Sequence, residues 1–400
     1  MRSKRKSTIS AADVKSEAAG WIQQHLKFED YSQRCTASVI LSVLLFAASR
    51  MRSIYDACQR LRNTPSDETV RQALLATLPP QRDLEARLNA ALGDRLPKPF
   101  FRRGQRVAID LTLIPYHGQA HREKREIYRG QPKHGTTHFH AYATAYVAQH
   151  GQRYTLAMTY VFGDEPVEEV LRRLMRQIQK LGVKVRLLLL DKGFFNAEVV
   201  RYLQAAGYPF LMPAFARGRK PKRPKPQSLH SYAACKRSGW GRYSWTNKQG
   251  RRATVSIAIV CRNSEGQRGR HGRRTQLYAY WGHQPGNARW VYETYRKRFG
   301  IETSYRQMNE TRIRTSTRNP LLRLLFVGLA LILRNVWVWC HLHWLAERRG
   351  PGILIHEELL RLREMTLWLQ HLVEREFELC LSKAIPNWRR QKELAIGTGK

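Results

Sequence analysis

Three acidic residues stand where a carboxylate is hard to accommodate without a chemical role. Asp110 lies in the middle of VAIDLTLI, whose alternating apolar residues predict a strand. Asp191 ends LLLLD, a run typical of a buried strand, and Glu302 lies in a later helical pattern. A buried carboxylate is costly unless something pairs with it. Because Mg²⁺ is bound by a few carboxylates together with waters and phosphate oxygens, the three acids predict a site for divalent cations.

The residues around Glu302 add positive charge to this site. At about 100° per residue, one helical face collects the following side chains: Tyr295, Arg298, Glu302, Arg306 and Asn309. Guanidinium groups hold phosphates well, often with two parallel hydrogen bonds. Two divalent ions can clamp the attacking and leaving oxygens of a displacement at phosphorus. The pattern therefore predicts phosphoryl transfer, and a solvated charged face is the structural alternative.

Each aspartate also has a structural alternative. Asp110 could face solvent from an edge strand, and Asp191 could cap the next helix. Asn196 is the better-placed cap for the helix that begins NAEVV, which leaves Asp191 free. The carboxyl ends of strands are also where functional groups gather in open α/β sheets. We therefore favour a functional role for both aspartates.

The chain carries a large excess of positive charge. Its 400 residues include 70 Lys and Arg against 31 Asp and Glu, a formal net charge of +39. Such a charge indicates a polyanionic partner, and nucleic acid is the first candidate. The hydrophobic content of 42% excludes disorder of the whole chain. Six scattered cysteines without a CxxC pair suit a reducing cytosol, so we expect a cytoplasmic, nucleoid-associated protein.

The elements that must position the acids alternate between strands and helices. The sequence predicts strands at 105–116, 137–149, 152–162, 183–191 and 209–213, with helices at 163–182 and 196–208. The strands on either side of His150-Gly151 form a predicted hairpin. This order predicts an α/β fold, in which helices flank a mixed sheet.

Shifts in composition divide the chain into five expected regions. They are a helical region for DNA binding or dimerisation (1–96), the first part of the α/β core (97–213), a basic β-rich insertion (214–286), the second part of the core with the Glu302 helix (287–347), and a C-terminal helix with a basic tail (348–400). The apolar run from Leu321 to Ala346 is long enough to span a membrane. Arg323 and Arg334 interrupt it, so we predict a buried helix and no membrane partner, with a membrane span as the alternative.

These motifs together resemble the DDE-class insertion-sequence transposases of the branch with a Tyr-Arg-Glu-Lys signature. Tyr295, Arg298 and Glu302 match the signature at its spacing. DKGF, which begins at Asp191, resembles the second-acid motif, and AIDLT around Asp110 resembles the first. The signature Lys falls on Asn309, and either Arg306 or Arg312 could replace it.

The resemblance implies an RNase H-like core in which Asp110, Asp191 and Glu302 are the catalytic metal ligands. They would hold two Mg²⁺ ions, for which Mn²⁺ could substitute. The implied activity is cleavage at terminal inverted repeats and strand transfer to target DNA by a homodimer in a synaptic complex. The residues expected to contact DNA are Tyr295, Arg298, Arg306, Asn309, Lys192, Trp240 and Trp245. The two tryptophans could stack on a flipped base, although packing within a β core is the alternative.

Two other functions compete with this interpretation. Because Asn309 departs from the signature, the chain could be a silent DNA-binding protein derived from a transposase. Hydrolysis without strand joining is possible too, since nucleases and resolvases share RNase H-like sites. His134, His138 and His140 could suggest zinc, but no further ligand has the spacing of a structural zinc site.

Overall fold

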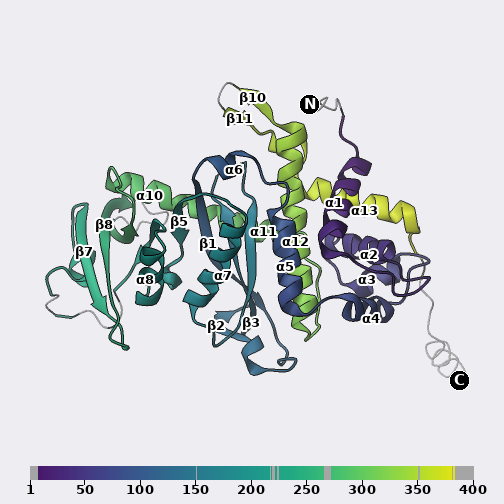
Figure 1. The fold of residues 1–400 in the computed structure, drawn as a ribbon, viewed down its shortest axis with the longest axis horizontal. Helices are drawn as coiled ribbons and strands as arrows, with labels where there is room; N and C mark the ends of the chain where they lie inside the picture. The colour runs from purple at the N-terminus through teal and green to yellow at the C-terminus, as the bar shows by residue number, and fades with distance from the viewer. Residues whose placement is uncertain are drawn as a thin grey trace, which may run out of the picture.

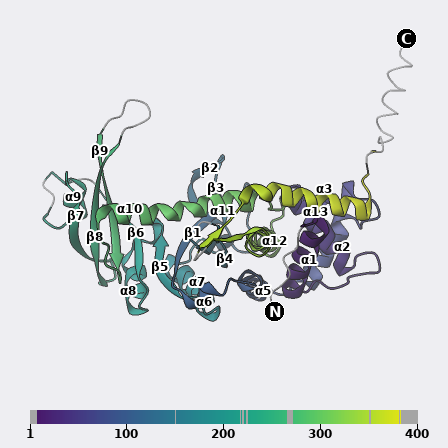
Figure 2. The same ribbon diagram turned by 90° about the horizontal axis from the view of Figure 1, so that it is seen from above.

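The computed structural model of the chain describes residues 8–149, 151–216, 218, 221–222, 225–264, 272–349, 352–380 and 382. The end of the expected basic tail lies outside these residues. Figure 1 shows helices from both ends of the chain on one side, a sheet in the middle, and the strands β7 and β8 at the opposite end. The elongated arrangement is also visible from above in Figure 2.

The N-terminal region is helical, as predicted. Its helices are α1 (Ala11–Leu26), α2 (Ala37–Ser49), α3 (Ile54–Arg60), α4 (Asp67–Thr77), α5 (Gln81–Gly93) and α6 (Pro99–Arg102). The first four each begin after a Ser or Thr whose side-chain oxygen accepts a hydrogen bond from a first-turn backbone N–H. The C-terminal helix α13 (Leu362–Phe377) returns to pack on α1 and α2.

Nine strands form one mixed sheet in the described part of the chain. They are β1 (Gln105–Pro115), β2 (Tyr128–Lys133), β3 (Thr136–Val147), β4 (Thr155–Val161), β5 (Val185–Leu190), β6 (Phe210–Ala214), β7 (Gly239–Thr246), β8 (Arg252–Ser264) and β9 (Gly272–Trp281). Their order is β2-β3-β1-β5-β6-β9-β8-β7, with β4 also paired to β3. β1 is antiparallel to β3 and parallel to β5, and β5 is parallel to β6. The predicted α/β fold with a mixed sheet is confirmed.

The β-rich insertion continues the central sheet. Its last strand, β9, pairs antiparallel with β6, and β8 and β7 follow outward. The strand β7 also contacts the core, because the centre of its Trp245 ring lies 5.1 Å from the centre of the Phe195 ring. The insertion is therefore anchored both through the sheet and beside the DKGF motif. The strand β2 and the hairpin of β10 (Glu347–Arg349) and β11 (Gly352–Leu354) were not predicted.

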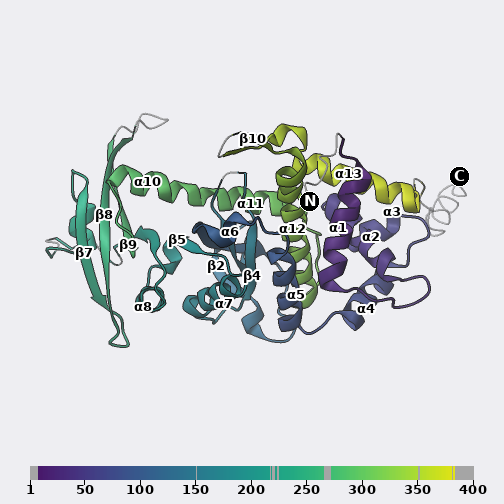
Figure 3. The same ribbon diagram turned by 45° about the horizontal axis from the view of Figure 1, so that its top comes forward.

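Further helices flank the sheet and lead back to the N-terminal region. They are α7 (Val167–Lys180), α8 (Ala197–Ala205), α9 (Leu229–Ala233), α10 (Ala288–Arg296), α11 (Gly300–Asn309) and α12 (Pro320–Cys340). Figure 3 shows α10 and α11 running across the molecule from the insertion towards α12. The predicted single helical face does not form, because a 3₁₀ turn over Lys297–Phe299 separates α10 from α11. Three residues at 3.0 instead of 3.6 per turn rotate the next helix by about 60° relative to the preceding one.

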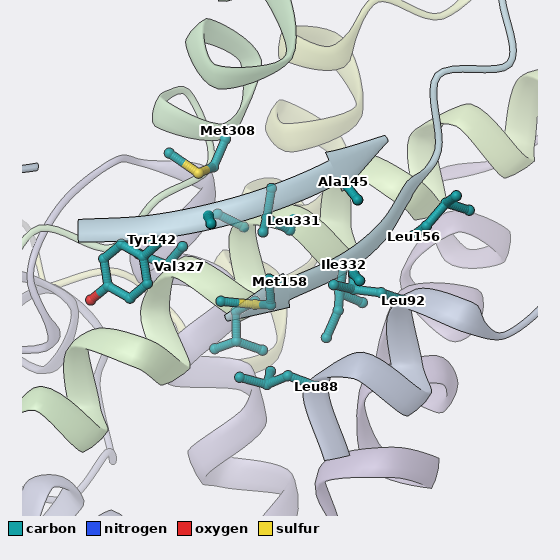
Figure 4. Close-up of a cluster of buried hydrophobic side chains, with 14 of the residues drawn as sticks. Leu88, Leu92, Tyr142, Ala145, Leu156, Met158, Met308, Val327, Leu331 and Ile332 are labelled. Carbon is teal, nitrogen blue, oxygen red and sulfur yellow. The ribbon is translucent and has the colours of Figure 1, made fainter. Parts of the chain in front are cut away.

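The apolar helix α12 lies in the core of the protein. The segment Pro320–Leu345 is long and apolar enough to cross a membrane, but 94% of its most apolar window is buried inside the protein. α12 packs against α5, α11 and β4. Figure 4 shows side chains of α5 and α12, among them Leu88 and Leu331, meeting Met158 of β4. Arg334 is buried and donates to the Arg153 carbonyl and to Gln307. This environment supports the core-helix prediction over a membrane span.

Side-chain amides cover the outer edge of β4, which pairs with β3 alone. The Met158 backbone N–H donates to Asn89 Oδ1 (2.8 Å), and Asn89 Nδ2 donates to the Met158 carbonyl (2.9 Å). Asn335 of α12 makes the same reciprocal pair with Thr155, at 2.9 and 2.8 Å. An edge strand otherwise presents unpaired backbone groups. These amides therefore replace a missing strand and fix α5 and α12 to the sheet.

Replacing Asn335 with leucine tests this edge. The Asn335→Leu change leaves the Thr155 N–H and carbonyl buried without their partner, and each lost partner costs about 1–3 kcal/mol. We expect the free energy of unfolding, measured by urea denaturation, to fall by roughly 3 kcal/mol. The control is Gln72→Leu on the exposed face of α4, where a change below ~0.5 kcal/mol is expected. Equal effects of the two variants would contradict the assignment.

Candidate active site

The sheet brings Asp110 and Asp191 to neighbouring positions. β1 and β5 are parallel, and Ile109 lies opposite Leu190 in their register. The next residue along each chain is one of the two aspartates. Neighbouring strands are about 4.8 Å apart, and residues opposite each other share a face of the sheet. The register therefore juxtaposes two carboxylates that are 81 residues apart in the sequence.

The structural alternatives for the two aspartates are wrong. Asp110 lies on a strand with neighbours on both sides, β3 and β5, rather than on an edge. Asn196 caps α8 by accepting from the Val199 N–H at 2.8 Å. Asp191 precedes a 3₁₀ turn and makes no side-chain capping bond there.

One guanidinium joins the two carboxylates. Arg298 Nη1 donates to Asp110 Oδ2 at 2.8 Å, and Arg298 Nη2 lies 3.3 Å from Asp191 Oδ1. Arg298 is only 6% exposed, and its Cζ lies 5.5 Å from the centre of the Tyr295 ring. Its Nε has no hydrogen-bond partner among the described residues. The expected phosphate-binding arginine therefore serves here as the cation that neutralises the acid pair.

Burial makes the charge on Asp110 difficult to maintain. It raises the pKa of Asp110 to about 6, an effect that Arg298 opposes and the charge of Asp191 strengthens. Two carboxylates this close cannot both ionise readily without a cation between them. Asp110 consequently depends on the positive charge of Arg298 to remain ionised.

Tyrosine hydroxyls hold the strands and helices of the site together. The Tyr305 hydroxyl donates to the Asp110 carbonyl at 2.9 Å, and the Tyr295 hydroxyl donates to the Leu190 carbonyl at 3.3 Å. Tyr146 of β3 donates to the Arg298 carbonyl at 3.1 Å. Tyr295, expected to contact DNA, is thus buried and fixes the end of β5. The roles of Tyr146 and Tyr305 were missed, since neither belongs to a motif; their only signal was a position on the buried face of a strand or helix.

Glu302 is not assembled with the aspartates. It is exposed, as is Arg306, whereas Tyr295 and Arg298 are buried. The described residues contain no group of three or more His, Cys, Asp or Glu side chains that could hold a metal ion. The 3₁₀ turn over Lys297–Phe299, which contains Arg298 and precedes Glu302, explains this difference, because it turns the start of α11 away from the face of α10. The structure thus unites two of the three predicted acids.

The chemistry of the donor set still fits a divalent cation. Two carboxylates already point at one shared positive group, and carboxylate oxygens are ligands that Mg²⁺ prefers. A cation at this point would need Arg298 to move aside. Asp110 and Asp191 are therefore the residues able to begin a metal site.

The remaining predicted DNA contacts lie at different places. Lys192 is exposed directly after Asp191. Trp240 is 47% exposed, whereas Trp245 is half-buried and stacks on Tyr243 at 5.2 Å. Asn309 is half-buried and accepts a hydrogen bond from Arg312 Nε at 3.1 Å. Trp240 and Lys192 are thus exposed, while Trp245 packs against the rings of Phe195 and Tyr243.

The histidine-rich strand does not support zinc binding. His140 is buried, its Nδ1 lies 3.0 Å from the Tyr160 hydroxyl, and burial lowers its pKa to about 3, with Arg323 adding to the effect. Its place in the core is that of a neutral, packed side chain. His134 and His138 belong to no metal-binding group in the described part of the chain.

Removing the guanidinium should make stability strongly dependent on pH. In Arg298→Met the pKa of Asp110 rises further. A protein with such a carboxyl loses folding stability as the pH rises from the pKa of Asp110 in the unfolded chain through its pKa in the folded protein. We expect the melting temperature, measured by scanning fluorimetry, to fall more at pH 8 than at pH 5, with a loss of about 3 kcal/mol when both acids are charged. The exposed Arg296→Met is the control and should show little change. An equal loss at both pH values would refute the charge argument.

Comparisons with known proteins identify relatives of the chain at the level of family and of fold. Residues 102–336 match the family described as Transposase DDE domain. The fold resembles a piggyBac transposase, solved by cryo-EM as a synaptic complex with hairpin DNA, with a TM-score of 0.54. That likeness covers 98% of this chain and 87% of the other at 9% identity, so it concerns the fold alone. No protein with a curated description matches the sequence. Since the matched segment spans more than half of the chain and contains both paired aspartates, the protein belongs to the DDE transposase domain family.

Proposed function

We propose that the protein is the DNA transposase of an insertion sequence, of the branch with the Tyr-Arg-Glu-Lys signature. It would cut its element at the terminal inverted repeats and join the ends to target DNA. The observation that carries the proposal is the paired Asp110 and Asp191 within the matched family segment. The net charge of +39 supports a nucleic-acid substrate.

Asp110 and Asp191 would hold the divalent cation that this chemistry requires, Mg²⁺ or Mn²⁺. A bound cation would stabilise the charge that develops on the phosphate oxygens during displacement. Arg298 would leave the carboxylates and become available to hold a DNA phosphate beside them. Lys192, exposed next to Asp191, would add a second phosphate contact. Water would be the nucleophile for cleavage, and the freed DNA 3′-hydroxyl would be the nucleophile for joining.

Glu302 would complete the site through a change at the 3₁₀ turn. If Lys297–Phe299 rewinds as α-helix, the start of α11 rotates by about 60° towards the face of Arg298. The helix break thus offers a way to assemble the third acid only when DNA is bound. Pairing of two element ends would require a homodimer, and the cytoplasm, on the nucleoid, is the proposed location.

An excision assay tests the proposed function. A marker flanked by the DNA that borders the gene is supplied together with the wild-type protein or with Asp191→Asn. We expect excision by the wild type alone, because the variant loses one carboxylate of the acid pair. Excision by neither protein, combined with binding of the ends in a shift assay, would favour the silent DNA-binding protein.

A second test asks whether Glu302 is the third acid. We expect Glu302→Gln to reduce cleavage of end DNA in vitro by about 100-fold or more, which corresponds to ~3 kcal/mol of barrier, with unchanged DNA affinity. Glu310→Gln, an exposed acid after the same helix, serves as the control. Full activity of Glu302→Gln would remove Glu302 from the mechanism.

A further inference from the structure

A break in the helix lies between the acid pair and Glu302. The helices α10 and α11 follow one another across the molecule, and the 3₁₀ turn over Lys297–Phe299 separates them (Figure 3). A short 3₁₀ stretch inside a longer helix is typical of a functional hinge. Gly300 follows the turn directly, and glycine destabilises a helix interior relative to alanine. The chain can therefore change conformation here more easily than in the two helices.

One buried hydroxyl binds the backbone of this turn. Tyr146 of β3 is 1% exposed, and its hydroxyl lies 3.2 Å from the Lys297 carbonyl and 3.1 Å from the Arg298 carbonyl. Burial raises the pKa of the phenol, so the hydroxyl keeps the proton that it shares between the two carbonyls. A continuous α-helix would pair these carbonyls with the backbone N–H groups of Ile301 and Glu302. The two hydrogen bonds from Tyr146, the Tyr146 contact, compete with that pattern and favour the 3₁₀ turn.

Gly300 permits the close approach of the Tyr146 hydroxyl. A Cβ atom at position 300 would lie 2.8 Å from this hydroxyl and 3.2 Å from Arg153 Nε. The first distance is shorter than a Cβ atom can reach without displacing its neighbour. A larger residue would push the hydroxyl away from the turn, so the Tyr146 contact depends on glycine at this position.

The turn is held from two sides, and α11 is fixed at a further point. The Arg298 side chain pairs with the two aspartates, while Tyr146 binds the backbone of the turn. The Tyr305 hydroxyl donates to the Asp110 carbonyl, which fixes the middle of α11 to β1. Glu302 lies between these points, four residues after Arg298 and three before Tyr305. A change at the turn can therefore move Glu302 while the middle of α11 stays on β1.

We propose that Tyr146 is a positioning residue, which keeps Glu302 away from the acid pair until Arg298 leaves the carboxylates and the turn rewinds. Once Arg298 has left, the Tyr146 contact alone opposes rewinding. The strength of this contact therefore sets how readily Glu302 joins Asp110 and Asp191. The inference rests on the proposed function for the role of Glu302 as the third acid, but cation binding can be measured without DNA and without cleavage.

The test measures the Mn²⁺ affinity of the full-length protein in the absence of DNA, by electron paramagnetic resonance. We expect Tyr146→Phe to bind Mn²⁺ about threefold to tenfold more tightly than the wild type, the range that the loss of one opposing hydrogen bond gives. This gain should disappear when Tyr146→Phe is added to Glu302→Gln, because it acts through the Glu302 carboxylate. The matched control is Tyr142→Phe on the same strand, whose buried hydroxyl has no hydrogen-bond partner among the described residues. Its affinity should equal that of the wild type.

A second substitution and the excision assay complete the test. Gly300→Ala keeps Tyr146 but places a methyl group against its hydroxyl, so we expect the same gain in affinity, again only with the Glu302 carboxylate present. It provides the measurement if Tyr146→Phe fails to fold. Unchanged or weaker Mn²⁺ binding in the folded variant, or a gain that persists in Glu302→Gln, would overturn the proposal. A gain that requires Glu302, in a protein that excises no DNA, would uphold the role of Tyr146 and count against the proposed transposase activity alone.

Discussion

The structure depends on a single electrostatic constraint, the need to bury two carboxylates side by side. The parallel register of β1 and β5 places Asp110 next to Asp191, and their mutual repulsion in a partly desolvated site requires a cation. Arg298 meets that need from the turn between α10 and α11. The hydroxyls of tyrosines on β3, α10 and α11 then fix this turn to the strands. The ion pairs of Arg298 with Asp110 and Asp191 therefore join the sheet to α10, α11 and the turn between them.

A pocket lined by Lys and Arg side chains lies along β1 beyond Asp110, and its charge is opposite to that of the acid pair. Along one face of β1, a pair of acids that needs a cation is followed by buried guanidiniums that lack an anion. A nucleic-acid strand with a divalent cation would satisfy both, since phosphates neutralise arginines while the cation joins phosphate to carboxylate.

Much of this fold follows from local sequence patterns, whereas the contacts that complete the site do not. The alternation of apolar residues predicted β1, and the Asp that ends LLLLD predicted the end of β5, because both signals lie in the local sequence. The pairing of β9 with β6 depends on residues far apart in the chain, so the insertion's union with the sheet was not predictable. Glu302 shows the same limit: three residues of 3₁₀ helix displaced it from the expected face, and Gly300, which follows that turn, does not by itself predict it. The amides Asn89 and Asn335, which cover β4, look like ordinary polar residues in helices until the edge strand is seen.

We propose that Asp110 and Asp191 together form a cation site in which Arg298 takes the place of a divalent metal. The most direct measurement is Mn²⁺ binding to the full-length protein, followed by electron paramagnetic resonance, for the wild type, Asp110→Asn, Asp191→Asn and the exposed Asp164→Asn. The account predicts saturable binding that Asp164→Asn retains and that either of the other two substitutions weakens by at least about tenfold. Binding of equal strength in all four proteins would contradict it.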